Sequence, residues 1–276
     1  MAAPDIPLED RYQHLVSIVR DMGSVVVGFS GGADSTLLMK VAADQLGERA
    51  IAVTAVSPSY PERDRREAID LASLVGARHL LVDSHEFEDP GYIANEPNRC
   101  FFCKRELFDI LRATAREHGF ETIAYGAITD DLGDFRPGME AARQAGARAP
   151  LLEAGFSKQD VREISRRLGL RTWDRPAAAC LSSRIPHGTP IDPAQLGRVE
   201  RCEDFLIARG FHQVRVRAHG EIARIECRPE DLPRLVEPLL RATLAERFKE
   251  AGFRYVTVDL EGYRTGSLNP IPGESD

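Results

Sequence analysis

The sequence predicts an α/β protein in which a parallel sheet is followed by a smaller C-terminal α/β domain. Three observations lead to this fold class. Short β-branched runs alternate with helical segments up to residue 125, a glycine loop follows the first run directly, and the order of elements changes after a proline- and glycine-rich stretch near residue 187. Strands that alternate with helices are typical of parallel sheets covered on both faces, whose ligands bind at the carboxyl edge of the strands.

Pattern and propensity place the elements of the larger domain in an alternating order. Strands are expected at β-branched runs that end in turn residues, and helices where apolar residues recur every three or four positions. The expected order is strand 24–29, helix 36–46, strand 50–56, helix 62–75, strand 79–82, helix 107–118, strand 122–125 and helix 157–168. Ser157 and Asp160 start the last helix in a near capping-box arrangement, and Gly169 ends it.

A smaller domain is expected after residue 186. The sequence Ile-Pro-His-Gly-Thr-Pro at residues 185–190 is rich in proline and glycine, which is typical of a hinge or linker. We therefore expect one domain over residues 1–186 and a second over residues 187–276. The second is predicted to contain, in order, helix 193–209, strands 213–217 and 222–228, helix 230–251 and strand 255–260.

A glycine loop, Ser30-Gly31-Gly32-Ala33-Asp34-Ser35, connects the first expected strand to a helix. Backbone N–H groups converge at a helix N-terminus, glycine lets phosphate oxygens approach the backbone, and the serines offer hydroxyl donors. Asp34 is placed either to position Mg²⁺ or to cap the helix, and an ordinary strand-to-helix turn is the alternative to a phosphate site. The loop matches neither the Walker A pattern nor the dinucleotide fingerprint, so a different phosphate loop is predicted.

The composition is that of a globular protein that acts on small molecules. Of the 276 residues, 43% are hydrophobic and 29% are charged, and the net charge of −7 argues against broad binding of nucleic acid. No run approaches the roughly 18 apolar residues of a membrane span, and the N-terminus lacks the pattern of a signal peptide. We therefore expect a cytoplasmic protein with no membrane partner. The odd number of cysteines, five, favours free thiols, metal ligands or catalytic sulfur over disulfides.

Three of the cysteines form a second informative pattern: Cys100 and Cys103, spaced C-x-x-C, and Cys180. The pair alone is compatible with a redox dithiol, half a zinc site, two iron–sulfur ligands or two cysteines at a helix start. Three thiolates leave one metal position open, and their softness favours zinc or an iron–sulfur cluster. The other two, Cys202 and Cys227, are expected in the core because free cysteine is among the most buried residue types.

Two further clusters are candidates for binding ions. Arg215 and Arg217 are two residues apart on an expected strand, so they point to one face and suit a phosphate. A solvated face on which these arginines pair with Glu226 is the alternative. A run of carboxylates either lines a Mg²⁺ site or forms a solvated acidic loop: Asp130, Asp131 and Asp134.

Together with the sequence from Cys180 to Ile185, these motifs resemble the LarE family of PP-loop ATP pyrophosphatases along nearly the whole chain. The resemblance implies a parallel-sheet PP-loop domain of the adenine nucleotide alpha hydrolase type. It also implies a sulfurtransferase that adenylylates the carboxylates of pyridinium-3,5-biscarboxylic acid mononucleotide with ATP, releases pyrophosphate and forms the thiocarboxylates of the nickel-pincer cofactor of lactate racemase. The implied partners are this small nucleotide substrate and further copies of the chain in a hexamer, with no nucleic acid.

The resemblance implies one of two sulfur sources. In one group of the family a single cysteine, at the position of Cys180, gives up its own sulfur and becomes dehydroalanine. In a second group three cysteines, which match Cys100, Cys103 and Cys180, hold a [4Fe-4S] cluster whose fourth iron carries an extra sulfide. The presence of Cys100 and Cys103 favours the cluster, and the donor of the incoming sulfide stays open.

The resemblance also implies roles for single residues beyond the cysteines. The pyrophosphate of ATP is held by Ser30, Gly31, Gly32 and Ser35. Asp34 acts with Mg²⁺ on the charge that builds between the α and β phosphates, and Lys104 assists at the α-phosphate. The residues implied in substrate binding are Ser183, Arg184, Glu200, Arg215, Arg217 and Arg264, with Glu203 a close competitor of Glu200.

Three other functions are compatible with parts of these motifs. A PP-loop tRNA thiolase shares the loop and the cysteines, but this sequence carries neither a basic tract nor a cysteine-pair zinc module for RNA. An amidotransferase-type synthetase does not require the three cysteines. A non-catalytic ATP or redox sensor would bind nucleotide without forming AMP.

Overall fold

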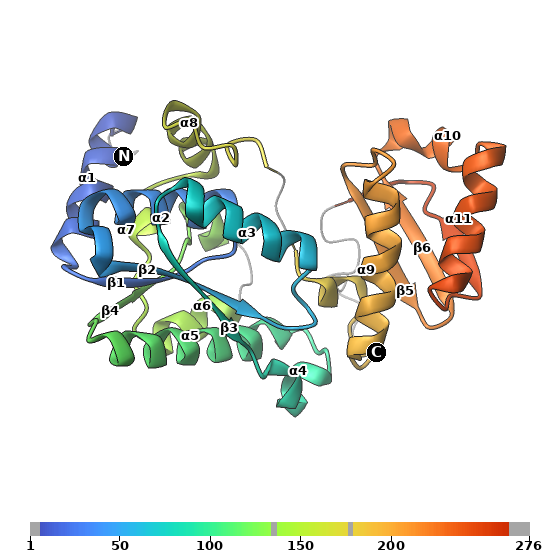
Figure 1. Cartoon of the computed structure of the whole chain (residues 1–276), viewed down its shortest axis with the longest axis horizontal. Coiled ribbons are helices and arrows are strands. Elements are labelled where there is room, and N and C mark those ends of the chain that lie inside the picture. Colours follow the sequence, from blue (N-terminus) through green and yellow to red (C-terminus); the bar gives the residue numbers. More distant parts are fainter. Residues whose placement is uncertain (1–5, 134–136, 176–178, 265–276) are drawn as a thin grey trace. The chain divides into compact units, whose positions relative to one another are not determined.

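The computed structural model describes residues 6–133, 137–175 and 179–264, and the chain divides into two compact units (Figure 1). The first unit is made of residues 1–57, 62–86 and 100–178. The second unit is made of residues 58–61, 87–99 and 179–276, so two short segments from the first half of the chain belong to it. The domain boundary expected at residue 187 stays a prediction.

The first unit is built on a parallel sheet with the strand order β3-β2-β1-β4. The strands are β1 (Val25–Gly28), β2 (Ala50–Val56), β3 (Arg78–Asp83) and β4 (Thr122–Ala124). The central strand β1 is paired on both sides, since Val26 lies opposite Ile51 of β2 and Ile123 of β4. The predicted fold class is confirmed, and the four strands lie where the sequence placed them along the chain. Because the strands are parallel, all four carboxyl ends point to one edge of the sheet.

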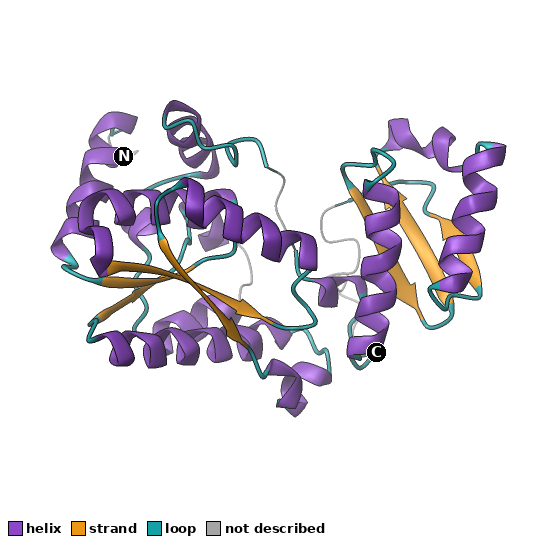
Figure 2. Cartoon of the chain, in the orientation of Figure 1, coloured by secondary structure: helices purple, strands orange, loops and turns teal. Residues whose placement is uncertain are grey.

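Helices cover both faces of this sheet (Figure 2). One face packs against α1 (Leu8–Asp21), α2 (Ala33–Leu46), α3 (Glu62–Leu74) and α8 (Lys158–Arg167) through a core that includes Leu15, Leu37, Leu71 and Val161. The other face packs against α5 (Arg99–His118) and α6 (Pro137–Gln144) through Phe108, Leu111 and Ala141. Two shorter helices are α7 (Pro150–Glu153), in the first unit, and α4 (Pro90–Ile93), which belongs to the second unit.

The start of α5 differs from the prediction in a way that matters for the cysteines. The sequence suggested a helix from residue 107, but α5 begins at Arg99. Phe101 packs against the same apolar cluster as Phe108 and Leu111, which extends the buried face of the helix toward its N-terminus. Cys100 and Cys103 therefore lie in the first turns of a long helix.

The second unit contains a three-stranded sheet in the order β5-β6-β7. Strands β5 (Val214–His219) and β6 (Ile222–Cys227) form an antiparallel hairpin, and β7 (Tyr255–Val258) pairs with β6 in parallel. Helices α9 (Pro193–Ile207) and α11 (Pro238–Glu250) contribute buried side chains to this unit, among them Leu196, Leu206 and Phe248. Val214 and Val216 are buried as the alternating pattern predicted.

The single helix expected over residues 230–251 is wrong. The segment forms a short 3₁₀ turn at Pro229–Asp231, a short α10 (Leu232–Leu235) and then α11. Pro233 and Pro238 each occupy the beginning of a helix, where the missing N–H has no intrahelical partner to lose. Among the residues that the structure describes, no helix combines the length and the apolar character needed to cross a membrane.

Candidate functional site

The phosphate loop, Ser30–Ser35, lies at the carboxyl end of β1 and leads into α2. Gly31 has a φ of +66°, a conformation that glycine adopts without strain. The Ser30 and Ser35 hydroxyl oxygens are 3.1 Å apart, and the Gly32 N–H donates to Ser30 Oγ at 3.4 Å. Gly32 is the N-cap of α2 and provides no side-chain cap. The first-turn N–H groups of α2 therefore suit an anion.

The loop is packed tightly by two neighbouring elements of the first unit. A Cβ added to Gly126, after β4, would lie 2.9 Å from the Ser35 backbone nitrogen. A Cβ added to Gly31 would lie 3.3 Å from Ala68 Cα in α3. Both approaches require glycine, and together they fix the position of the loop backbone. Gly126 is a contribution to the site that the sequence analysis did not single out.

Asp34 is paired with Lys158, the second residue that the sequence analysis missed. Lys158 Nζ lies 2.8 and 2.9 Å from the two carboxylate oxygens of Asp34. Lys158 begins α8, whose predicted capping box of Ser157 and Asp160 is present in full. That capping box was the signal that could have located Lys158, because it fixes which residue opens the helix.

The acidic run after β4 is used mainly for local backbone contacts. Asp130 Oδ2 accepts a hydrogen bond from the Lys158 backbone N–H at 2.9 Å, and Asp131 Oδ2 accepts one from the Ile128 N–H at 3.0 Å. Asp134 and the neighbouring Arg136 lie outside the described residues. Asp130 thus helps to place Lys158 beside Asp34.

A polar contact lies next to the phosphate loop at the ends of β1 and β2. The Thr54 hydroxyl donates to the Phe29 carbonyl oxygen at 2.6 Å and lies 2.8 Å from His79 Nε2. Burial lowers the pKa of His79 below its ordinary value, so the ring is neutral at pH 7. The arrangement fixes the backbone at Phe29, directly before the loop.

The three candidate cysteines are divided between the two units, and none is in a disulfide. Cys100, which is exposed, and Cys103, which is half-buried, are one turn apart on α5 in the first unit. Cys180 is half-buried and precedes a 3₁₀ turn, Leu181–Arg184, in the second unit. Within the described part of the chain, no three Cys, His, Asp or Glu side chains gather closely enough to hold a metal. Lys104, in the same part of α5, packs its side chain over Gly138, where an added Cβ would lie 2.7 Å from Lys104 Cγ.

The remaining two cysteines have a different environment. Cys202 and Cys227 are buried, at 2% and 0% exposure, which confirms the expectation that they lie in the core. Burial raises the pKa of the Cys202 thiol to about 12 and that of Cys227 to about 11. Both thiols are therefore protonated and unreactive near neutral pH.

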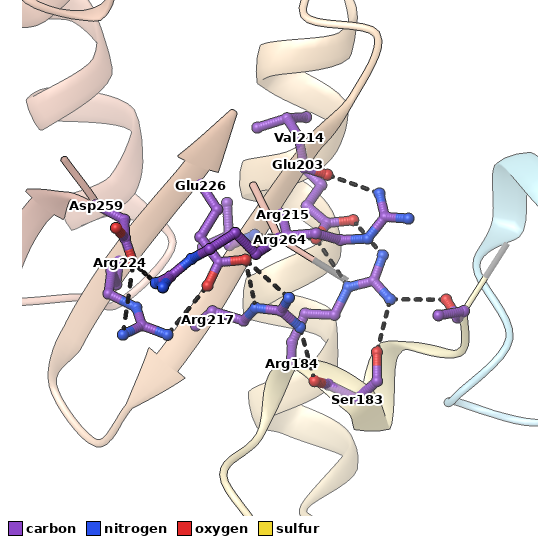
Figure 3. A network of polar contacts seen from close by, with 12 residues as sticks. Ser183, Arg184, Glu203, Val214, Arg215, Arg217, Arg224, Glu226, Asp259 and Arg264 are labelled. Carbon is purple, nitrogen blue, oxygen red and sulfur yellow. Dashed lines mark hydrogen bonds and ion pairs between the residues drawn. The ribbon is translucent and has the colours of Figure 1, made fainter. Parts of the chain in front are cut away.

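The backbone at Cys180 is held by a buried ion pair. Arg184 and Glu203 are 1% and 0% exposed, and their side chains form two hydrogen bonds of 2.9 and 3.0 Å (Figure 3). Arg184 Nη1 donates to the carbonyl oxygens of Ala179 and Cys180 at 2.7 and 2.9 Å. All three guanidinium nitrogens of Arg184 are thus engaged within the protein. Glu203, not Glu200, is the buried glutamate of α9, and it also accepts the Val216 N–H at 3.0 Å.

The arginine face consists of Arg215, Arg217 and Arg224 on β5 and β6 (Figure 3). Arg217 and Arg224 both bind the buried Glu226, with closest distances of 2.8 and 3.0 Å, and Arg217 Nη1 donates to the Ser183 carbonyl oxygen at 2.9 Å. Of the two arginines in the alternative that the sequence offered, Arg217 pairs with Glu226, and the pair is buried and not solvated.

Arg215 differs from its neighbours on the arginine face. It donates to the Val214 carbonyl oxygen at 2.8 Å and lies 5.4 Å from the Tyr263 ring, but it makes no ion pair with a carboxylate of the described residues. Burial, and then the nearby Arg184, lower the pKa of Arg215. Arg215 is thus a half-buried cation that forms no ion pair among the described residues, a setting that suits a phosphate. Arg264 forms ion pairs with Glu261 and, at 3.7 Å, with Asp259.

Comparison with known proteins gives this geometry a family. A family model described as NAD synthase matches residues 8–89, which include the phosphate loop. The chain is 44% identical to an uncharacterized protein of Synechocystis sp. over 96% of this chain and 98% of the relative. It is 38% identical to the pyridinium-3,5-bisthiocarboxylic acid mononucleotide synthase of Lactiplantibacillus plantarum over 92% of each chain. The chain belongs to the LarE family.

Membership of the LarE family makes the protein an ATP-using sulfurtransferase of the PP-loop class. A more distant similarity, 29% identity over 55% of this chain, relates it to the tRNA-specific 2-thiouridylase of Treponema denticola, of which the match covers 51%. The family implies ATP and Mg²⁺ as cofactors. The phosphate loop fits the first, because its backbone and hydroxyl groups are suited to phosphate oxygens, and Asp34 offers the oxygen ligands that Mg²⁺ prefers.

Proposed function

We propose that this LarE-family enzyme activates the carboxylates of pyridinium-3,5-biscarboxylic acid mononucleotide with ATP and converts them to thiocarboxylates for the nickel-pincer cofactor of lactate racemase. A substrate carboxylate oxygen attacks the α-phosphorus of ATP, the bond to the bridging oxygen of the β-phosphate breaks, and pyrophosphate leaves. Sulfide then attacks the acyl carbon, and AMP leaves with the former carboxylate oxygen. The observation that carries the proposal is the phosphate loop at the end of β1, with its Gly31 backbone, paired serines and uncapped helix.

The first unit supplies the groups for the adenylylation step. Ser30, Gly31, Gly32 and Ser35 bind the pyrophosphate portion of ATP. Asp34 holds Mg²⁺, which supplies charge neutralisation at the phosphates when it is bound. Lys158, which contacts Asp34 at 2.8 Å, places a second positive charge beside the loop, and Lys104 acts at the α-phosphate.

The second unit supplies the groups for the nucleotide substrate. Arg215, with Arg217 and Arg264, binds the phosphate of the mononucleotide, and Ser183 lies beside it. This assignment is supported by the half-buried guanidinium of Arg215, which forms no ion pair among the described residues, and by the hydrogen bond from Arg217 to the Ser183 carbonyl oxygen. Arg184 and Glu203 hold the backbone at Cys180 in place, which keeps the sulfur-bearing segment in one conformation.

Cys100, Cys103 and Cys180 are proposed to hold a [4Fe-4S] cluster, which when bound supplies an exchangeable sulfide at its open iron. Three thiols outside disulfides suit this group by their chemistry. Arg99, the residue before Cys100, donates to the carbonyl oxygen of Ser182, two residues after Cys180, at 3.1 Å. Both residues of this bond belong to the second unit.

Iron and acid-labile sulfide content, measured with the visible spectrum after anaerobic reconstitution, tests the cluster. The wild type is expected to contain about four irons and at least four sulfides, and Cys180→Ala is expected to lose them. Cys202→Ala, which removes a buried thiol, is the matched control and is expected to keep the cluster. An iron-free wild type would contradict the cluster and favour sacrifice of the Cys180 sulfur, seen as loss of hydrogen sulfide from the mass of the polypeptide after turnover.

AMP and pyrophosphate formation tests the activation step separately. Both products are expected from ATP only when the pyridinium mononucleotide is present. Product formation with unmodified tRNA in its place would contradict the proposed substrate and favour the thiolase alternative. A hexameric assembly in solution, also part of the proposal, is tested by light scattering of the purified protein.

A further inference from the structure

Arg175 contacts the phosphate loop from the chain segment that follows α8. Its Nη1 donates to the Gly31 carbonyl oxygen at 3.0 Å, and its Nη2 lies 3.0 Å from Asp64 Oδ1 in α3. The contact to Gly31 joins residues 144 positions apart in the sequence. A single guanidinium thus bridges the loop and the helix against which the loop packs.

The bridge determines the orientation of one peptide plane. In a trans peptide the carbonyl of Gly31 and the N–H of Gly32 point in opposite directions. When Arg175 holds the carbonyl, the Gly32 N–H points away from Arg175, and it does so toward Ser30 Oγ. Two successive glycines rotate more freely than other residues, so without this contact the peptide can turn its carbonyl oxygen toward a bound phosphate.

The charge of Arg175 is balanced on the side away from the loop. Asp64 is 3.0 Å from the guanidinium, and Glu67 is 3.7 Å from it. Both carboxylates are on α3, which also contacts Gly31 through Ala68. Arg175 therefore affects the loop mainly by fixing the orientation of the Gly31–Gly32 peptide, and less by adding positive charge beside it.

We propose that Arg175 is a positioning residue that holds the phosphate loop in its pyrophosphate-binding conformation. The inference rests on the proposed role of the loop in binding the pyrophosphate of ATP. It adds a residue outside the loop to that role. The neighbouring Arg171 is a natural control, because it pairs with Glu67 at 3.2 Å and has no contact with the loop among the described interactions.

The experiment compares Arg175→Ala, Arg175→Lys and Arg171→Ala with the wild type. Binding of inorganic pyrophosphate in the presence of Mg²⁺ is measured by calorimetry, and KM is measured for ATP and for the pyridinium mononucleotide. Arg175→Ala is expected to weaken pyrophosphate binding and raise KM for ATP by about tenfold, the effect of one charge-assisted hydrogen bond. KM for the mononucleotide is expected to stay unchanged, whereas a mere loss of folded protein would lower kcat and leave both KM values alone. Arg175→Lys, which keeps one donor, is expected to recover part of the loss.

The experiment distinguishes a failure of the proposed loop function from a failure of the role proposed for Arg175. Wild-type protein that does not bind pyrophosphate would overturn the role proposed for the loop itself. Wild-type protein that binds pyrophosphate no more tightly than Arg175→Ala does would overturn the role of Arg175 alone. If Arg175→Ala does not fold, Asp64→Ala replaces it, because this variant keeps Arg175 but removes the carboxylate nearest to its guanidinium. It is expected to weaken pyrophosphate binding by about threefold, and unchanged binding would contradict the proposal.

Discussion

The phosphate loop of the first unit and the arginine face of the second are both suited to phosphate oxygens, but they are built from different parts of the chain. The loop uses backbone N–H groups and hydroxyls from six consecutive residues. The arginine face uses side chains whose partners, Glu226 and the Ser183 carbonyl oxygen, come from separate elements. A backbone site is fixed by local conformation, whereas a side-chain site depends on buried charge pairs. Changes to charge and changes to backbone should therefore affect the two regions differently.

The largest effect is expected in the second unit, where charge is buried. Glu203→Ala leaves Arg184 buried without its carboxylate, and we expect the free energy of unfolding to fall by about 3 kcal/mol or more. Urea denaturation measures this change. Glu200→Ala, on the same helix but half-buried, is the control and is expected to cost about 1 kcal/mol or less. Equal denaturation midpoints for the two variants would show that the second unit does not depend on this ion pair.

A glycine-to-alanine change is expected to lower the stability of the first unit at Gly126 and to raise that of the second unit at Gly197. Gly126→Ala puts a Cβ 2.9 Å from the Ser35 nitrogen, and overpacking of this kind costs about 1–3 kcal/mol and displaces the loop. Gly197→Ala in α9 meets only the end of Arg201, at 3.5 Å, and should raise stability by up to about 1 kcal/mol through helix propensity. Thermal denaturation and pyrophosphate binding of both variants check the contrast. Undiminished pyrophosphate binding by Gly126→Ala would contradict the tight fit of the loop.

Charge in the first unit is expected to matter for activity and little for stability. Lys158→Met removes the partner of Asp34, and we expect kcat/KM for ATP to fall by about tenfold or more. The pair is partly exposed, with side-chain exposures of 30% and 26%, so the change in stability should stay below about 1 kcal/mol. Lys40→Met removes a similar pair with Asp44 elsewhere on α2 and should leave ATP turnover unchanged. Equal turnover by the two variants would remove Lys158 from the proposed site.

The smallest change in stability is expected at Arg215. Arg215→Gln removes a partly buried charge that has two arginine neighbours, so stability should change by no more than about 0.5 kcal/mol, while KM for the mononucleotide rises by about tenfold. Arg217→Gln removes a partner of the buried Glu226 and should cost about 1–3 kcal/mol. Chemical denaturation and substrate titration of both variants check the contrast: both are expected to raise KM, but only Arg217→Gln is expected to lower stability markedly. A KM that does not respond to Arg215→Gln would contradict the proposed phosphate contact.

The features that could be predicted are those that depend on residues close together in the sequence. The strands, the phosphate loop and the Ser157–Asp160 capping box each follow from a few consecutive positions. The break between α10 and α11 was also readable, because Pro233 and Pro238 cannot donate the hydrogen bonds of a continuous helix. The burial of Glu203 in α9 was readable too, since it follows the buried positions Leu196 and Val199 at helical spacing. Which of Glu200 and Glu203 binds substrate stays a prediction.

The contacts that complete the candidate site could not be predicted in this way. Lys158 reaches Asp34 across 124 positions of sequence, and Arg175 reaches Gly31 across 144. The capping box shows that Lys158 opens α8, but it does not show that the side chain reaches Asp34, and no local pattern marks Arg175. Lys158 and Arg175 reach the phosphate loop only because α8 and the segment after it pack beside α2 and α3. The roles of the residues predicted for substrate and cluster binding stay proposals.

The composition of the second unit has a consequence for how genes of this family can recombine. Asn95, from the segment of residues 87–99, is fully buried, and its side-chain amide donates to the carbonyl oxygens of Pro186 and Thr189 at 2.8 and 2.9 Å. A single crossover at residue 187 would therefore join an Asn95 from one parent to a Thr189 from the other. Because the acceptors are backbone carbonyl oxygens, these contacts depend on the side chain at position 95 and not on those at positions 186 and 189. A second unit exchanged at residue 187 would therefore keep them only where the other parent also has an amide donor at position 95.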